Sequence, residues 1–190
     1  HTLEGRLSAL QRIQAQAEQN GKIQDWLEKY GLQNLPRLWQ KLNVEPGWEV
    51  AVESILRERL HALELSDPDL LQRLLDDAPQ SRLSVYGRES GGAPAQNHGE
   101  FRPLCALVRC ADEAVRAVVE GWLHGCYAVE GMPPQTTRTT LPAGTVLVNR
   151  EGHQFTRYAV AFYGPDSGDA GILARQREIE GLTEAVAQSA

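Results

Sequence analysis

The feature that most constrains this chain is a short heptad pattern at each of its ends. Near the start, small or apolar residues recur at alternating steps of four and three, with Gln14 in the gap: Leu3, Leu7, Leu10 and Ala17. Near the other end, the same seven-residue repeat places Ile172, Ile179, Leu182 and Val186. The pattern is typical of a coiled-coil seam, but two heptads do not form a stable helix alone in water. Each stretch therefore needs something to pack against.

Two arrangements satisfy that need. The two ends pair with each other in antiparallel fashion, as the short stump of a coiled coil, or they are two unrelated amphipathic helices that dock on a core. Periodicity alone favours neither arrangement. In both, Asn20 and Gly21 end the first helix, because both residues tolerate the left-handed backbone found at helix ends.

The composition is that of an ordinary globular protein. The 190 residues are 42% hydrophobic and 23% charged, which is enough to bury a core. The net charge of −6 argues against a strongly basic nucleic-acid module, although a local basic patch remains compatible with it. No apolar run approaches the roughly 18 residues of a membrane helix, so we expect no membrane partner.

The cysteines and the single methionine indicate the compartment and the origin of the chain rather than a catalytic site. Three cysteines in a chain of this length predict free thiols and a reducing, cytoplasmic compartment. The only methionine is Met132, so we expect the chain to be a piece of a longer protein.

Two blocks lie between the terminal stretches, separated by a region rich in Gly, Pro and Ala. In the first block, helical spacing over 50–65 precedes a helix over 69–77 whose buried stripe we expect to be Leu70, Leu71, Leu74 and Leu75. Residues 60–65 fit a short strand equally well, and 82–86 alternate as a strand does.

The second block alternates between strand and helix patterns. It predicts a strand over 104–109, a helix over 112–123, and two strands over 145–150 and 154–163 joined by a turn at Glu151 and Gly152. The four tryptophans lie at helical spacing from apolar neighbours, which favours anchoring in the core over stacking on bases: Trp26, Trp39, Trp48 and Trp122.

A search for catalytic or metal-binding motifs finds none that is convincing. No phosphate-binding loop with its Gly-Lys-Ser/Thr ending is present, and in the run from Gly164 to Gly168 the serine stands one place too late for a nucleophile elbow. The cysteine spacing does not match a zinc site. An enzyme that uses Cys126, His124 and Ser167 is supported by residue types alone. We therefore predict no catalytic residue, no metal, no cofactor and no small-molecule substrate.

Arginines gather towards the end of the second block. Arg138, Arg150, Arg157, Arg175 and Arg177 fall within forty residues. They fit a phosphate-binding face, or simply a solvated helix face and strand edge.

Two segments carry a resemblance to a known family. Residues 145–182 end in the pattern Gly-Ile-Leu-Ala-Arg-Gln-Arg-Glu-Ile over Gly171–Ile179, and Pro46–Glu53 reads Pro-Gly-Trp-Glu-Val-Ala-Val-Glu. Both resemble the hinge domain of bacterial structural maintenance of chromosomes (SMC) proteins, in a proteobacterial branch. The resemblance covers essentially the whole chain and favours the paired arrangement of the two ends.

The resemblance implies an α+β fold of two subdomains, each with a small sheet and packed helices, flanked by antiparallel coiled-coil stumps. We expect coiled coil at 1–20 and 167–190, subdomain one at 21–87, a flexible linker at 88–100 and subdomain two at 101–166. It also implies a cytoplasmic, nucleoid-associated hinge of a condensin-type ATPase whose heads lie elsewhere, which joins two arms in chromosome condensation and segregation and is not itself an enzyme.

Members of the family form homodimers through two equivalent contacts, subdomain one of each copy against subdomain two of the other. We expect the last strand to meet a strand such as 107–109 of the partner. The predicted interface residues are Leu107, Arg109, Tyr158, Val160, Phe162, Tyr163 and Gly164. Strand alternation allows only half of the last strand's side chains to point outward.

The sequence departs from the family at its glycine pairs. The positions that align with them hold Tyr158-Ala159, Phe162-Tyr163 and Arg57-Glu58. The alternative function is weak, salt-sensitive DNA binding near the arm junction, because hinges of this family can bind DNA. It points to Arg150, Arg157, Arg175 and Arg177.

Overall fold

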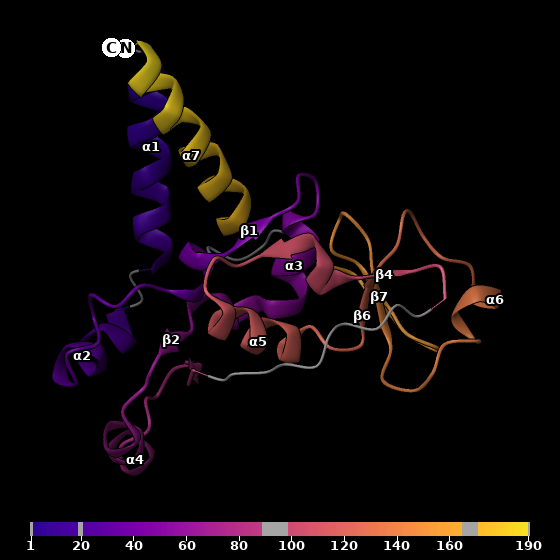
Figure 1. Cartoon of the computed structure of the whole chain (residues 1–190), viewed down its shortest axis with the longest axis horizontal. Coiled ribbons are helices and arrows are strands. Elements are labelled where there is room, and N and C mark those ends of the chain that lie inside the picture. Colours follow the sequence, from indigo (N-terminus) through magenta and orange to yellow (C-terminus); the bar gives the residue numbers. More distant parts are fainter. Residues whose placement is uncertain (1, 19–20, 89–98, 165–170, 190) are drawn as a thin grey trace.

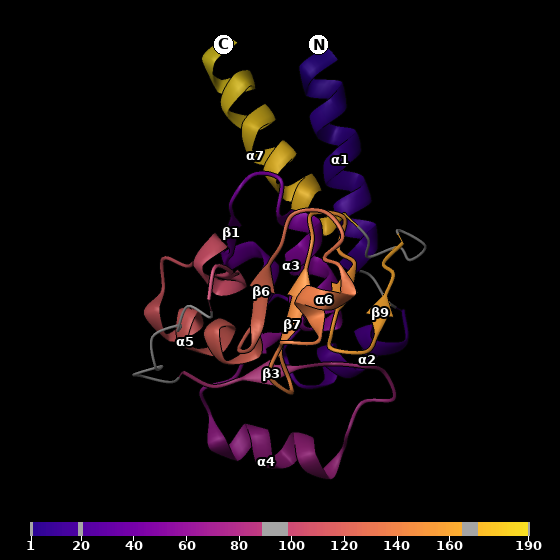
Figure 2. The same ribbon diagram turned by 90° about the vertical axis from the view of Figure 1, so that its right-hand side faces the viewer.

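The computed structural model describes residues 2–18, 21–88, 99–164 and 171–189. Its terminal helices, α1 (Thr2–Glu18) and α7 (Ile172–Ser189), lie side by side and antiparallel, with both chain ends at the same tip (Figures 1 and 2). An ion pair joins Arg6 to Glu178 across the helices. The paired arrangement of the two ends is therefore confirmed.

The body of the molecule begins with a lobe of two helices and a small sheet. α2 (Gly21–Lys29) and α4 (Pro68–Asp76) flank two parallel strands, β2 (Leu63–Glu64) and β3 (Val85–Tyr86). Asp67 caps α4 by accepting a hydrogen bond from the Asp69 N–H at 2.9 Å, and Pro68 fills the first helical position, where its missing N–H is not needed. Figure 1 shows α4 projecting on the side away from the terminal helices.

The central layer joins α3 (Glu49–Leu56) to α5 (Glu113–Trp122). Around these helices run three short 3-10 helices at Leu38–Lys41, Arg57–His61 and Leu104–Leu107. Strands β1 (Asn43–Val44) and β5 (Val108–Arg109) pair antiparallel beside them. Asp112 caps α5 through the Ala114 N–H, as the sequence pattern predicted for the start of this helix.

The far end of the molecule is a five-stranded sheet with the order β4-β6-β7-β8-β9. Its strands are β4 (Arg102–Pro103), β6 (Cys126–Ala128), β7 (Val146–Val148), β8 (Gln154–Phe155) and β9 (Val160–Ala161). β6 and β7 are parallel, with helix α6 (Gln135–Arg138) in the crossover, and the other neighbours are antiparallel.

Buried side chains form three clusters. The largest contains residues from both predicted subdomains and the first turn of α7, among them Trp48, Val52, Val115 and Ile172. A second cluster fills the α2–α4 lobe, and a third lies under the five-stranded sheet around Phe155. The division into subdomains stays a prediction. Most of the predicted linker lies outside the described residues.

Several predicted elements differ in detail from the observed ones. The strand expected over 104–109 begins as a 3-10 helix and is extended only at β5. The strand expected over 154–163 is two strands, β8 and β9, because the chain reverses at a tight turn between them. On α4, only Leu74 is buried, while Leu75 and Leu71 are 67% and 38% exposed. A nine-residue helix that packs on one side buries a single i, i+4 ridge, and the second leucine ridge faces out.

The predicted roles of the tryptophans are confirmed. Trp39 and Trp48 are buried, and Trp26 and Trp122 pack against the clusters. No helix of the described chain is both long and apolar enough to span a lipid bilayer.

Candidate functional site: open strand edges and the arm junction

β9 forms one edge of the five-stranded sheet, and within the described residues its outer side has no strand partner. The β8–β9 hairpin closes where the Thr156 N–H donates to the Ala159 carbonyl at 2.9 Å, so Arg157 and Tyr158 form a two-residue turn. Bonded and non-bonded residues alternate along an antiparallel pair. Val160 therefore directs its N–H and C=O away from β8. We call residues 157–164 the β9 edge.

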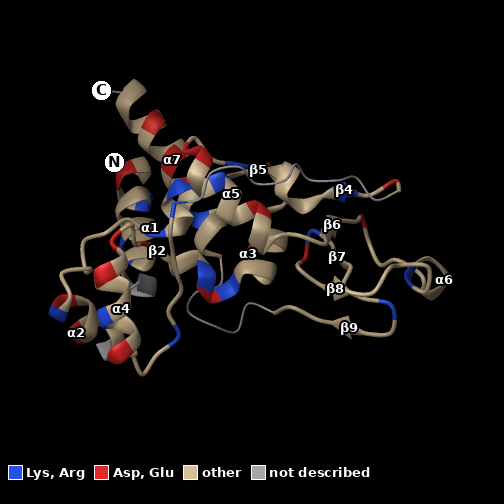
Figure 3. Cartoon of the chain, turned by 60° about the horizontal axis from the view of Figure 1, so that its bottom comes forward, with Lys and Arg blue, Asp and Glu red and all other residues tan. Residues whose placement is uncertain are grey.

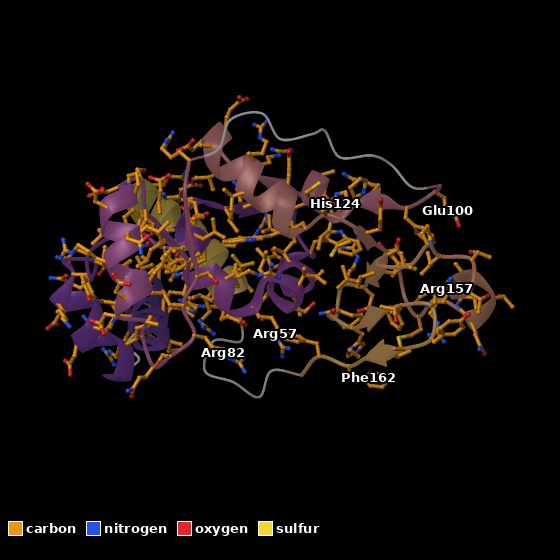
Figure 4. All side chains as sticks on the ribbon, turned by 90° about the horizontal axis from the view of Figure 1, so that it is seen from below. Arg57, Arg82, Glu100, His124, Arg157 and Phe162 are labelled. Atoms are coloured by element: carbon orange, nitrogen blue, oxygen red, sulfur yellow. The ribbon has the colours of Figure 1, made fainter. Side chains whose placement is uncertain are left out.

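The side chains of the β9 edge are exposed to an unusual degree. Tyr158 is 78% exposed, Phe162 74% and Val160 38%. Figure 4 shows Phe162 at the outer margin of the sheet, with Arg157 at the turn. The Phe162 ring packs edge-on against His153, with the ring centroids 5.3 Å apart. Large exposed aromatic groups beside unpaired backbone are typical of surfaces that associate with another chain.

Arg138 supports this hairpin from α6. Its guanidinium lies 3.4 Å from the Ala159 carbonyl oxygen and 3.5 Å from that of Thr156, the two residues that close the turn. From the sequence, Arg138 was grouped with the phosphate-facing arginines. The structure instead places it where it holds the turn of the β9 edge, a role that no sequence spacing indicates.

A second open edge belongs to β3. The Leu63 and Leu65 N–H groups donate to the Ser84 and Tyr86 carbonyls, which therefore face β2. In a parallel ladder the intervening residue, Val85, turns its N–H and C=O to the other side. No described strand lies there. We call residues 83–87 the β3 edge.

The two open edges belong to comparable units of the fold. β2–α4–β3 and β6–α6–β7 are both parallel strand pairs connected through a helix. In the second unit, β8 of the same chain covers the outer side of β7. In the first unit, the matching position beside β3 has no described occupant.

The exposed apolar residues concentrate at these two places. Of the eight large hydrophobic side chains exposed in the described chain, Leu71 and Leu75 lie on α4 beside the β3 edge and three lie on the β9 edge. The balance of charge differs between the two places. Asp67, Asp69, Asp76 and Asp77 lie on or next to α4 together with Arg73, and Arg82 and Arg88 flank the β3 edge, while residues 152–164 contain Arg157 and no acidic residue. Figure 3 shows charged residues sparser at the sheet end than on the helical lobe.

The segment 107–109, predicted as the partner strand, occupies a different environment. Leu107 is 2% exposed and belongs to the largest core cluster, so its side chain offers no surface to another molecule. Arg109 is exposed, and its strand β5 is already paired on one side with β1.

The arm junction, where α7 leaves the body, is organised by Glu53. This side chain on α3 is 4% exposed. Its Oε1 accepts hydrogen bonds from the Gly171 N–H at 2.7 Å and the Ile172 N–H at 2.9 Å, and its Oε2 accepts one from the Tyr163 hydroxyl at 2.7 Å. The sequence pattern placed Glu53 in a motif but gave no sign of this role.

Gln14 completes the junction from α1. Its Nε2 donates to the Ile172 carbonyl at 2.7 Å, and its Oε1 accepts from Arg175 Nε at 2.8 Å. The residue that interrupts the apolar seam is therefore buried and links the two terminal helices.

The four arginines predicted for DNA binding do not form one free basic face. Arg150 makes a bidentate ion pair with Glu130 and stacks over the Trp48 ring, 4.5 Å from its centroid. Arg177 contacts Glu49 and the Val44 carbonyl, and Arg175 bonds to Gln14. Arg157 is exposed on the β9 edge, 5.4 Å from the Tyr158 ring.

The described residues contain no group of three His, Cys, Asp or Glu side chains arranged to hold a metal. All three cysteines are free thiols. Burial raises the pKa of Cys110 and of Cys126 to about 11, so both thiols stay protonated and unreactive at neutral pH. Ser167, the third residue of the enzyme hypothesis, lies outside the described residues, so that hypothesis stays untested.

Comparison with known proteins shows which family and which relatives the chain is similar to. The family described as "SMC proteins Flexible Hinge Domain" matches residues 32–133. Chromosome partition protein Smc of Burkholderia pseudomallei is 45% identical over 187 residues, which are 98% of this chain and 16% of that protein. Chromosome partition protein Smc of Coxiella burnetii is 50% identical over 178 residues, 93% of this chain and 14% of that protein. The chain therefore spans about a sixth of these curated relatives.

Solved structures show the same fold. An asymmetric dimer of the Geobacillus stearothermophilus SMC hinge domain aligns with a TM-score of 0.62 at 18% identity, covering 98% of this chain and 87% of that one. The Pyrococcus furiosus Smc hinge domain with an extended coiled coil aligns with a TM-score of 0.56 at 15% identity, covering 97% of this chain and 70% of that one. Because the family match extends over more than half of its length, the chain belongs to the SMC flexible hinge family, as the sequence resemblance predicted.

Proposed function

We propose that this chain is a homodimerisation hinge in which the β9 edge of each copy pairs with the β3 edge of the other. The observation that carries the proposal is that β9 and β3 each have an outer side without a strand partner among the described residues, and that exposed apolar side chains lie on β9 and on the helix before β3. The position beside β3, which has no strand among the described residues, corresponds to the one that β8 covers beside β7. A strand from a second copy fills it by adding to the sheet.

Two such contacts, related by a twofold axis, close a ring. Each copy then gives one edge and receives one, so association stops at the dimer. The charges and the exposed apolar side chains fit this pairing. On the β9 edge, Tyr158 and Phe162 lie near Arg157. On α4, Leu71 and Leu75 lie near a group of aspartates. The proposal takes β3 rather than 107–109 as the receiving strand because the exposed Leu71 and Leu75 lie on the helix that leads into β3, whereas the Leu107 side chain is buried.

The remaining predicted contacts divide between direct and supporting roles. Tyr158, Val160 and Phe162 make the contact in this proposal. Tyr163 is half-buried and bonds to Glu53, so it supports the edge from behind, and Gly164 ends it.

The proposal extends to the cellular role that the relatives suggest. In a cytoplasmic, nucleoid-associated protein of chromosome partition, such a hinge joins two coiled-coil arms, each built on the α1–α7 pair of one copy. DNA binding by the arginines stays a prediction, and the intramolecular partners of Arg150, Arg175 and Arg177 do not favour it.

The test is the solution mass, measured by light scattering over a range of concentrations. We expect twice 21.0 kDa for the natural sequence and a monomer for the double change Tyr158→Asp with Phe162→Asp. Val85→Pro removes an outward N–H without touching the bonds to β2, and we expect it to weaken the dimer as well. Arg109→Ala is the matched control. A dimer that survives the first two variants in folded protein and is lost in the control would overturn the pairing.

A further inference from the structure

Glu53 is the buried carboxylate that the proposed dimer contact does not itself use. A carboxylate with 4% exposure is strongly destabilising unless its oxygens are hydrogen-bonded. Here three donors satisfy it, and they come from two different parts of the chain: the Tyr163 hydroxyl, and the Gly171 and Ile172 N–H groups. The Glu53 junction, as we call these four residues, therefore concentrates three charge-assisted hydrogen bonds on one side chain.

Each donor belongs to an element with a separate task. Tyr163 lies two residues beyond β9, the strand with the open edge. Gly171 and Ile172 begin α7, where the positive end of the helix favours a carboxylate. The Ile172 carbonyl also accepts a hydrogen bond from Gln14 of α1. The backbone of Ile172 therefore links the position of α7 to that of α1.

Packing leaves Tyr163 little room to move independently of α3. Gly152 has a φ of +88°, and a Cβ added to it would lie 2.9 Å from Tyr163 Cδ2 and 3.1 Å from Ser54 Cβ. The tyrosine ring thus fits closely between the turn before β8 and the helix that carries Glu53. A shift of the β9 edge passes to the carboxylate through a hydrogen bond and a tight contact.

We propose that Glu53 is a positioning residue that fixes the direction in which α7 leaves the body and couples it to the strand that pairs with the partner. The inference rests on the proposed function only in its second half. Coupling of this kind is reciprocal: if β9 pairing steadies Tyr163, it also steadies the first turn of α7, and an ordered α7 favours a competent β9 edge.

The experiment measures arm direction within one chain. Spin labels are attached to Glu113→Cys on α5 and Glu184→Cys on α7, two exposed positions, in a Cys105→Ala background that removes the half-buried thiol. Labelled protein is diluted into an excess of unlabelled protein, so that each measured distance comes from a single chain. For the natural junction we expect one narrow distance distribution.

Three variants test the junction. Glu53→Gln loses the charge and replaces one of the two acceptor oxygens by an NH2 donor. Tyr163→Phe removes the hydroxyl that links the β9 edge to Glu53, at nearly constant volume. Glu58→Gln, an exposed glutamate close by, is the matched control. We expect both junction variants to broaden the distribution and to raise the dimer dissociation constant about tenfold, which is the size of one charge-assisted hydrogen bond. The control should change neither quantity.

The outcomes separate the two proposals. A purely structural role predicts a lower melting temperature in Glu53→Gln with an unchanged distribution and an unchanged dissociation constant, and that result would overturn the inference. If the junction variants broaden the distance distribution but leave the dimer dissociation constant unchanged, the proposed coupling between α7 and the β9 edge would be overturned. If the natural chain is monomeric at every concentration, the dimer proposal fails, while the distance distribution still decides whether Glu53 positions α7.

Discussion

At the scale of single residues, Arg57 has an unusual backbone conformation. Among the described residues it is the only non-glycine with a positive φ, +52° with ψ −124°. Side chains with a Cβ rarely adopt this region, and doing so costs on the order of 1–3 kcal/mol. In the resemblance to the family, Arg57-Glu58 aligns with a glycine pair, and that alignment stays a prediction. A positive φ at Arg57 is a backbone geometry that glycine would adopt more easily.

Replacing Arg57 should reveal that strain. We expect Arg57→Gly to stabilise the folded chain by about 1 kcal/mol, since glycine adopts the conformation freely and part of the gain is offset by its greater freedom in the unfolded state. Urea unfolding measures the change. Glu58→Gly is the control: its backbone is ordinary, and glycine there should destabilise. A destabilised Arg57→Gly protein would mean that the arginine side chain contributes more than its backbone costs.

At the scale of elements, the α2–α4 lobe depends on one carboxylate. Asp77, just beyond α4, accepts hydrogen bonds from Lys29 Nζ at 2.7 Å and the Tyr30 hydroxyl at 2.5 Å, and its backbone carbonyl accepts one from Trp26 Nε1 at 2.8 Å. These contacts tie the helix that flanks the β3 edge to α2. The hydrogen bond from Lys29, followed by that from Tyr30, lowers the pKa of the Asp77 carboxyl.

The lobe should therefore loosen in acid. A carboxyl whose pKa is lower in the folded than in the unfolded state stabilises the fold above its unfolded value, about 3.9, and that stabilisation is lost as the pH falls through the lowered folded value. We expect the indole N–H signal of Trp26 in NMR spectra to shift below about pH 4. Asp77→Asn should abolish this transition and Asp69→Asn should leave it, whereas an unchanged transition in Asp77→Asn would assign it to another group.

At the scale of the whole molecule, a ring with two contacts makes a prediction that a single contact does not. A chain with a damaged β9 edge and a chain with a damaged β3 edge each lack both contacts when alone. Mixed together, they can form one intact contact, from the good β9 edge of one to the good β3 edge of the other.

Complementation of this kind is the sharpest test of the pairing. The first variant carries Tyr158→Asp with Phe162→Asp, and the second carries Val85→Pro. We expect each to be monomeric alone and the two to associate weakly when mixed, as seen by sedimentation or light scattering. Arg109→Ala separates the two receiving strands. It should dimerise by itself if β3 receives the β9 edge, whereas it should be monomeric alone and associate weakly with the first variant if 107–109 does. No association in the first mixture would argue against β3 as the receiving strand.

Local patterns in the sequence were sufficient for the helices and the turns. Heptad spacing predicted α1 and α7, and helical spacing placed α4 and α5 within one residue of their observed bounds. They did not resolve 154–163 into two strands, because Arg157-Tyr158 lacks the glycine or asparagine that usually marks a two-residue turn. Nor did periodicity show which leucines of α4 are buried, since two adjacent ridges carry the same residue type and only the packing partner distinguishes them.

The sequence by itself determined the family and the heptad character of both terminal helices, because these depend on residue order and local spacing, and the family resemblance in turn favoured the pairing of those helices. Only the tertiary structure decided that Leu107 is buried, that β3 has an open edge and that Glu53 joins Tyr163 to α7. Those properties depend on contacts between residues more than a hundred positions apart, or on which side of a strand is already occupied. Backbone pairing and burial are set by neighbours in space, and no local pattern encodes them.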